Sequence, residues 1–241
     1  MDKTDIHSHI LPGMDDGSAN LEESLEMLRL AAGQGFRDFI ATPHYSSFYR
    51  NLCPERIREQ CAWLEEKANA AVQEGIRIYP GQELFYEAGL EEKLDEGKVL
   101  TLAGSSYVLI EFALRTPYPE MYRALQRLRL AGYCPILAHA ERYPAFWDGQ
   151  RILELLEAGT LVQLNYGSLE GRFLEKRTRL CRQLLGKGAV HFLGTDMHGA
   201  RHRPPRTEKA FAWMERHLDE EQIEALCRGN AEKLLKNESI L

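Results

Sequence analysis

The chain has 241 residues, of which 44% are hydrophobic and 27% charged, and its formal net charge is −6. These values are typical of a globular protein that buries its core without disulfides, and the acidic balance disfavours a nucleic-acid partner or an anionic membrane. No apolar run approaches the roughly 18 residues of a membrane-spanning helix. The first residues lack the apolar segment of a signal peptide.

The five cysteines are widely spread and form no C-x-x-C pair, as expected of buried thiols in a reducing compartment. We therefore expect one domain over residues 1–241, a cytoplasmic location and no membrane insertion. The sequence gives no indication of the oligomeric state.

Short apolar runs alternate with amphipathic helical patterns along the chain. Strands are predicted at Thr4–Ser8, Asp38–Thr42, Arg77–Gly81, Tyr107–Phe112, Pro135–His139, Leu161–Asn165 and His191–Thr195. Helices are predicted at Leu21–Gln34, Pro54–Glu74, Ala88–Glu96, Tyr118–Ala131, Gln150–Ala158 and Arg172–Gly186. Asn20 or Ser18 is a candidate N-cap of the first helix. Thr207–Leu241 predicts two or three further helices, with Asp219 and Asn230 as caps.

Seven alternations of strand and helix predict an α/β fold with a parallel sheet and helical crossovers. We favour closure into a seven-stranded (β/α)7 barrel over an open sheet, because polar residues follow most of the predicted strands. In barrels of this type the reactive groups collect at the carboxyl ends of the strands.

The segment Asp5-Ile6-His7-Ser8-His9 closes the first predicted strand. Alternate residues of a strand point to the same side, so His7 and His9 can act together as ligands of a divalent metal. Taken alone the pattern is weak, because two unrelated polar histidines would look the same.

Further imidazoles and carboxylates follow other predicted strands. The complete set of candidate metal ligands is His7, His9, Asp16, His44, Glu83, Glu111, His139, Asp196 and His198. Each could be a solvated or structural polar residue, but five of the eight histidines fall in the set. Imidazole and carboxylate without thiolate suit Mn²⁺, iron or Zn²⁺ rather than a structural zinc. We expect two or three divalent ions, with Mn²⁺ favoured and iron or Zn²⁺ as alternatives.

These motifs together resemble the polymerase-and-histidinol-phosphatase (PHP) superfamily. The resemblance is carried by Asp5-x-His7-x-His9, Pro43-His44, Glu83, Ile110-Glu111-Phe112, Ala138-His139-x-Glu141-Arg142-Tyr143 and Thr195-Asp196-Met197-His198. Within that superfamily, His7–Gly17, Thr116-Pro117-Tyr118 and Arg203-Pro204-Pro205 are similar to bacterial tyrosine-protein phosphatases of capsular and exopolysaccharide operons. The resemblance spans the chain and implies a distorted (β/α)7 TIM-like barrel with a trinuclear metal centre.

The resemblance also implies how the ligands are shared between ions. One ion would be held by His7, His9, Glu83 and Asp196. Glu83 would bridge to a second ion, held also by Glu111 and His139. The third ion would be held by Asp16, His44 and His198. Arg142 and Arg203 match positions that contact the substrate phosphate.

The expected reaction is hydrolysis of phosphotyrosine by a metal-activated hydroxide that attacks phosphorus in line. His44 or His198 is a candidate acid for the leaving phenolate. The resemblance implies a phosphotyrosine-bearing protein as substrate, with the tail of a bacterial tyrosine kinase as the expected partner. Two alternatives stay open: a phosphatase of histidinol phosphate or another small monoester, and a non-catalytic metal-binding module.

An aromatic loop directly follows the candidate ligand His44. Tyr45, Phe48 and Tyr49 could line the mouth of the cleft and contact an aryl phosphate. The alternative is that these rings pack the loop onto the helix predicted at Pro54–Glu74.

Overall fold

The computed structural model describes residues 2–46, 53–172 and 175–240. These residues form strands β1 (Lys3–Ser8), β2 (Phe36–Ala41), β3 (His44–Tyr45), β4 (Arg77–Pro80), β5 (Glu83–Phe85), β6 (Tyr107–Glu111), β7 (Cys134–Leu137), β8 (Leu161–Asn165) and β9 (Phe192–Gly194). The pairings are parallel, in one sheet of order β1-β2-β4 and a second of order β3-β5-β6-β7-β8-β9. The α/β class with a curled parallel sheet is therefore confirmed.

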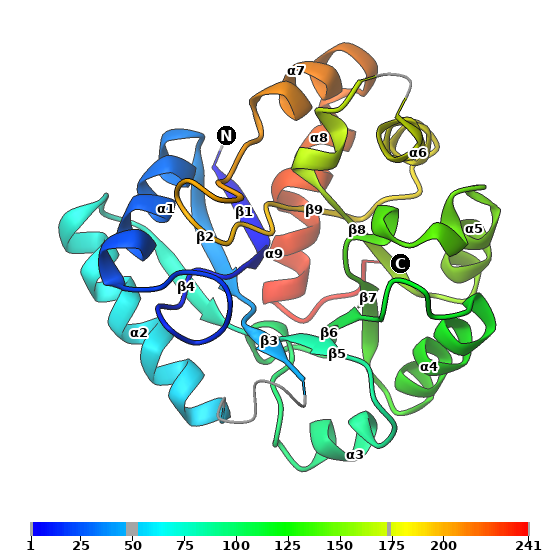
Figure 1. Cartoon of the computed structure of the whole chain (residues 1–241), viewed down its shortest axis with the longest axis horizontal. Helices are drawn as coiled ribbons and strands as arrows, with labels where there is room; N and C mark the ends of the chain where they lie inside the picture. The colour runs from blue at the N-terminus through cyan, green and yellow to red at the C-terminus, as the bar shows by residue number, and fades with distance from the viewer. Residues whose placement is uncertain (1, 47–52, 173–174, 241) are drawn as a thin grey trace.

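Helices surround the curled strands (Figure 1). The surrounding set is α1 (Leu21–Gly33), α2 (Pro54–Ala71), α3 (Leu90–Asp95), α4 (Tyr118–Leu130), α5 (Gln150–Glu157) and α6 (Lys176–Gly186). Each matches a predicted helix within a few residues. The expected N-cap of α1 is confirmed, because the Asn20 side chain accepts a hydrogen bond from the Glu23 N–H at 3.0 Å.

The C-terminal region contains α7 (Glu208–His217), α8 (Glu220–Glu224), a π-helical turn over Ala225–Gly229, and α9 (Asn230–Leu235). Asp219 caps α8 in a capping box with Gln222, as predicted. The prediction of Asn230 as a cap is wrong. The helical path runs through it from the π turn into α9, and its side chain donates to the His191 carbonyl at 2.8 Å.

Two short strands were not predicted. The second and third predicted strands, Asp38–Thr42 and Arg77–Gly81, are observed as β2 and β4, and each is followed after a short gap by a further strand, β3 or β5. A Cβ on Gly81 would lie 2.9 Å from Ile40 Cγ2, so glycine permits the close approach of the two segments at this point. His44 pairs with Glu83 across β3 and β5. The two short strands therefore bring two predicted ligands side by side.

The two sheets are connected by contacts between β1 and the segment that follows β9. Ser8 and Met197 form an isolated parallel bridge, and the His9 N–H donates to the Met197 carbonyl at 3.0 Å. Because the strands are divided between two sheets, the count of seven in a closed barrel is not confirmed. The observed architecture is a curled parallel sheet that approaches closure at this seam.

Two apolar clusters lie on the two sides of the strands. The outer cluster packs the strands against the surrounding helices. The inner cluster includes Ile6, Ile136 and Phe192 together with Ala231 and Leu234 of α9. Tyr107, at the start of β6, also belongs to it and donates to the Glu238 carbonyl. The chain's C-terminal helix thus covers the amino ends of the strands, and their carboxyl ends are left for the polar residues.

All five cysteines are free, as expected. Cys61, Cys181 and Cys227 are buried, whereas Cys134 is partly buried and Cys53 is exposed, so fewer thiols are buried than the sequence predicted. Among the described helices, none combines the length and the apolar character that a membrane span requires.

His191 is expected to make the stability of the fold depend on pH in the acidic range. Its Nδ1 accepts the Val162 N–H at 3.2 Å, and burial lowers its pKa to about 4. In the unfolded chain its pKa is near 6.5. As the pH falls below that value, the unfolded chain therefore takes up a proton that the folded chain does not yet bind. The stabilisation is present above pH 6.5 and is lost as the pH falls toward 4.

We expect this residue to lower the free energy of unfolding by about 1–2 kcal/mol between pH 7 and pH 5. His191→Gln should remove that part of the pH dependence in urea denaturation at the two pH values. Identical pH dependence in both proteins would show that His191 is not buried as a neutral imidazole.

Candidate metal centre

The nine predicted ligands converge at the carboxyl ends of the strands. His7 lies on β1 and His9 directly follows it, while His44, Glu83 and Glu111 lie on β3, β5 and β6. The remaining four lie in the segments after β1, β7 and β9: Asp16, His139, Asp196 and His198. This is the edge at which parallel α/β enzymes assemble their sites.

The first group of side chains is buried around the histidine pair of β1. The Nε2 atoms of His7 and His9 lie 3.4 Å apart. Glu83 Oε2 lies 3.3 Å from His7 Nε2 and 3.4 Å from His9 Nε2. Asp196 Oδ1 is 3.6 Å from each of these nitrogens. Two imidazoles and two carboxylates therefore face one point.

The second group lies on the other side of Glu83. Its Oε1 is 2.8 Å from His139 Nε2, which is also 3.4 Å from Glu111 Oε1. His44 Nδ1 lies 3.0 Å from Glu83 Oε2 and 3.7 Å from Glu111 Oε2. Glu83 thus contacts imidazoles of both groups, which is the geometry required of a bridging carboxylate.

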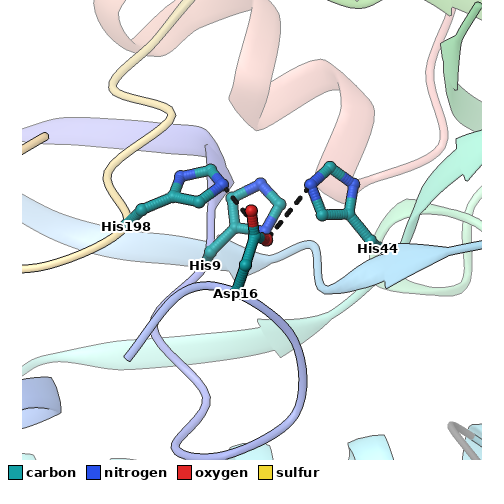
Figure 2. A group of neighbouring side chains, drawn as sticks. All are labelled: His9, Asp16, His44 and His198. Atoms are coloured by element: carbon teal, nitrogen blue, oxygen red, sulfur yellow. Dashed lines mark ion pairs between the residues drawn. The ribbon is translucent and has the colours of Figure 1, made fainter. Parts of the chain in front are cut away.

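The third group is formed by Asp16, His44 and His198, with the His9 side chain beside them (Figure 2). Asp16 Oδ1 lies 3.4 Å from His44 Nε2 and 3.6 Å from His198 Nε2, and the Asp16 side chain is 56% exposed. The ring of His9 lies between the rings of His198 and His44. Its centroid is 3.9 Å from the centroid of His198 and 4.6 Å from that of His44. His9 therefore faces this group as well as the first, and His44 faces both the second and the third, so the groups share ligands more than the sequence suggested.

The backbone is strained at this edge. Three residues other than glycine have left-handed φ values here: His139 at 33°, Asp196 at 50° and Arg203 at 53°. Such conformations cost of order 1–3 kcal/mol each and persist where the surrounding structure fixes them. Their concentration around the clustered side chains is typical of a functional site.

The donor set fits divalent cations. Glu83 Oε2 and His198 Nε2 are buried and have no hydrogen-bond partner among the described residues. Burial opposes charge on His139, yet the carboxylates of Glu111 and Glu83 raise the pKa of its imidazole to about 10. A bound divalent cation would compensate the negative charge of these carboxylates. Imidazole nitrogens and carboxylate oxygens are ligands that such cations accept.

Asp15 orients His9, a role that the sequence analysis did not assign. Asp15 Oδ2 lies 2.7 Å from His9 Nδ1 and also accepts the His44 N–H at 2.9 Å. A carboxylate that accepts from Nδ1 leaves Nε2 as the nitrogen that can bind metal. The signal in the sequence was the neighbouring pair Asp15-Asp16, of which only the second was chosen.

Two amides of β8 connect ligands from three other segments. Gln163 Oε1 accepts the His139 N–H at 2.7 Å and lies 3.1 Å from His7 Nδ1. Gln163 Nε2 donates to Asn165 Oδ1, and Asn165 Nδ2 donates to Asp196 Oδ2 at 2.7 Å. Both residues occur at alternate positions of an apolar strand, so their side chains point to one side. This alternation is the sequence feature from which the role of the two amides could have been predicted.

The two predicted phosphate-binding arginines reach the same edge. Arg203 Nη2 donates to Asp196 Oδ2, and Arg142 Nη1 lies 3.8 Å from the same oxygen. Both side chains are partly exposed, Arg142 at 33% and Arg203 at 45%. Their guanidinium groups are therefore at the cluster and accessible to a ligand.

Of the three residues predicted to form the aromatic loop, the structure describes Tyr45. The Tyr45 hydroxyl donates to Glu87 at 2.8 Å and accepts from Lys93 Nζ at 2.8 Å, next to α3. The Tyr45 hydroxyl therefore makes these hydrogen bonds outside the cluster of candidate metal ligands. Phe48 and Tyr49 lie outside the described residues, so their contact with the substrate stays a prediction.

A curled parallel α/β sheet that gathers imidazoles and carboxylates at its carboxyl edge is typical of metal-dependent hydrolases. Residues 3–236 match the family model described as capsular polysaccharide synthesis, CpsB/CapC. The chain belongs to this family.

The curated relatives cover nearly the whole chain. The tyrosine-protein phosphatase YwqE of Bacillus subtilis is 34% identical over 98% of this chain and 92% of its own length. The tyrosine-protein phosphatase CpsB of Streptococcus agalactiae is 31% identical over 98% of this chain and 99% of its own length. The putative tyrosine-protein phosphatase CapC of Staphylococcus aureus is 30% identical over 98% and 92%.

Solved structures agree with this assignment. A structure described with YwqE of Bacillus subtilis and CpsB of Streptococcus pneumoniae as metal-dependent tyrosine phosphatases has a TM-score of 0.89 at 31% identity. It covers 99% of this chain and 96% of its own. The Escherichia coli phosphotriesterase homology protein has a TM-score of 0.65 at 12% identity, over 97% of this chain and 98% of its own. That likeness is one of fold.

We predict that Gln163→Leu weakens metal binding by about 10- to 100-fold, the usual cost of removing a group that orients ligands. His7 and the His139 N–H would both lose their hydrogen-bond partner. Isothermal titration of the metal-stripped protein with Mn²⁺ measures the affinity. Gln126→Leu is the control, because the Gln126 amide bonds to the Ala158 carbonyl at the outer helices. Equal affinity in the Gln163 variant and the wild type would remove Gln163 from the site.

Proposed function

We propose that the nine clustered side chains hold two or three divalent cations, with Mn²⁺ favoured and iron or Zn²⁺ as alternatives. The observation that supports this most is the position of Glu83, whose two carboxylate oxygens lie within 3.4 Å of imidazole nitrogens from both buried groups. The chain is a metal-dependent phosphoric monoester hydrolase of the protein-tyrosine-phosphatase type.

Bound cations would lower the pKa of coordinated water and neutralise phosphate charge. Three groups of side chains support the proposed ligand assignment. His7, His9, Glu83 and Asp196 surround one position, and Glu83, Glu111 and His139 a second. Asp16, His44 and His198 surround the third, with His9 beside them.

Arg142 and Arg203 would bind the phosphoryl oxygens. Both approach Asp196 Oδ2, so this one carboxylate holds two guanidinium groups at the edge of the cluster. A planar guanidinium donates two parallel hydrogen bonds to a phosphate and fixes its orientation as well as its charge.

The leaving phenolate has a pKa near 10 and needs only modest assistance. His44 and His198 are the two candidate acids from the sequence. The Nδ1 of His198 lies 3.0 Å from the Asp196 carbonyl oxygen, so its proton is already placed there and Nε2 faces the cluster. This geometry suits His198 as a ligand. Both nitrogens of His44 also face carboxylates of the cluster, so His44 could act as the acid only when its imidazole is not bound to metal.

Several finer expectations belong to the same proposal. The residues 1–241 would form one catalytic domain, with β2 and β3 as one strand position and β4 and β5 as another, which gives the seven positions of a distorted barrel. The substrate would be a phosphotyrosine-bearing protein, and the tail of a tyrosine kinase of capsule synthesis is the proposed partner. The five free cysteines are compatible with the cytoplasm.

The direct test is a phosphatase assay of metal-stripped protein that is reconstituted one metal at a time. We expect Mn²⁺ to restore phosphate release from a phosphotyrosine peptide, with slower release from the matched phosphoserine peptide and from histidinol phosphate. His139→Ala is the inactive control. Equal turnover of the two peptides would contradict the tyrosine assignment, and metal binding without any phosphate release would favour a non-catalytic module.

The arginine assignment has a separate test. Arg142→Lys and Arg203→Lys should each lower kcat/KM on a phosphotyrosine peptide by about ten- to hundred-fold, because a point charge cannot replace a bidentate fork. Arg179→Lys, on the exposed side of α6, is the matched control. Wild-type kinetics in both lysine variants would remove the two arginines from the site.

A further inference from the structure

A pocket of about 560 Å³ adjoins the candidate metal centre on the side of β8 and β9. Asp196 and Arg203 line both the pocket and the centre, and Asn165 lines the pocket at the end of β8. Because Arg203, one of the two proposed phosphate-binding residues, lines this pocket, residues that neighbour a phosphotyrosine held at the centre could reach this space.

Three further arginines line the pocket and have no assigned role. Arg201 and Arg206 lie in the segment between β9 and α7, and Arg177 lies in the first turn of α6. All three side chains are exposed, and within the described ranges none of them forms an ion pair with a carboxylate. In contrast, Arg203 is already bonded to Asp196.

The charge balance of the pocket favours an anion. Glu170 and Glu175 also line it, so the three arginines exceed these two carboxylates by one charge, since Arg203 and Asp196 are paired with each other. The helix α6 begins at the pocket wall without a side-chain cap, and its first-turn N–H groups add positive potential.

We propose that this pocket is a subsite for an anionic side chain that flanks the phosphotyrosine in the same peptide. The inference rests on the proposed function, because it takes the phosphoryl group to lie beside Asp196 and Arg203. Guanidinium groups recognise a carboxylate and a phosphate by the same forked hydrogen bonds. The flanking group is therefore either an acidic residue or a second phosphotyrosine.

Four phosphotyrosine peptides of equal length distinguish these sources. They carry aspartate, a second phosphotyrosine, alanine or lysine at positions within four residues of the target, since an extended chain advances about 3.3 Å per residue. We expect kcat/KM for the aspartate or doubly phosphorylated peptide to exceed that for the alanine peptide by about ten-fold at low salt, the size of a few exposed ion pairs. The better of the two identifies the source.

The variant Arg177→Gln/Arg201→Gln/Arg206→Gln should bring the ratio of acidic to neutral peptide close to one. Arg179→Gln, which leaves the pocket lining unchanged, should keep the wild-type ratio. If the triple variant folds poorly, Arg201→Glu provides a second test, because it should shift the preference toward the lysine peptide.

A triple variant that keeps the wild-type ratio, or a wild-type enzyme without preference for anionic peptides, would overturn the subsite. A reconstituted wild-type enzyme that releases phosphate from neither these peptides nor p-nitrophenyl phosphate would overturn the proposed function itself, and the subsite with it.

Discussion

The buried carboxylate of Glu83 is the interaction on which the rest of the site depends. Its oxygens lie within 3.4 Å of nitrogens of His7, His9, His44 and His139, and its side chain is 1% exposed. A carboxylate buried so deeply is costly unless positive charge compensates it. The surrounding imidazoles and the proposed cations supply that charge, so removing either would leave the centre of the molecule unbalanced.

The two short strands that follow β2 and β4 explain how Glu83 reaches this position. Gly81 lets the chain pass close to Ile40, and the short strands β3 and β5 then place His44 opposite Glu83. The inner apolar cluster and α9 fill the opposite end of the strands. The apolar core therefore fixes the edge at which the polar residues meet, and the amides of Gln163 and Asn165 fix their orientation.

Much of this was predictable from the sequence, because the apolar periodicity of the strands and the residue types at their ends are local features. The nine clustered residues follow from those features. The short strands β3 and β5 were missed because two or three residues carry no periodicity. The role of Gln163 was missed because its contact with His7 joins residues 156 positions apart. Asn230 resembles a helix cap, but its amide bonds to a distant carbonyl instead.

The central claim is that these side chains form a centre for more than one ion, and the metal content of the chain tests it most directly. After reconstitution with Mn²⁺ and removal of free metal, mass spectrometry should find two or three ions per wild-type chain. Asp16→Ala should bind one ion fewer, because the ion pairs of Asp16 among the described residues are with His44 and His198, the other ligands of the third group. A single ion per wild-type chain, unchanged in the variant, would contradict the account.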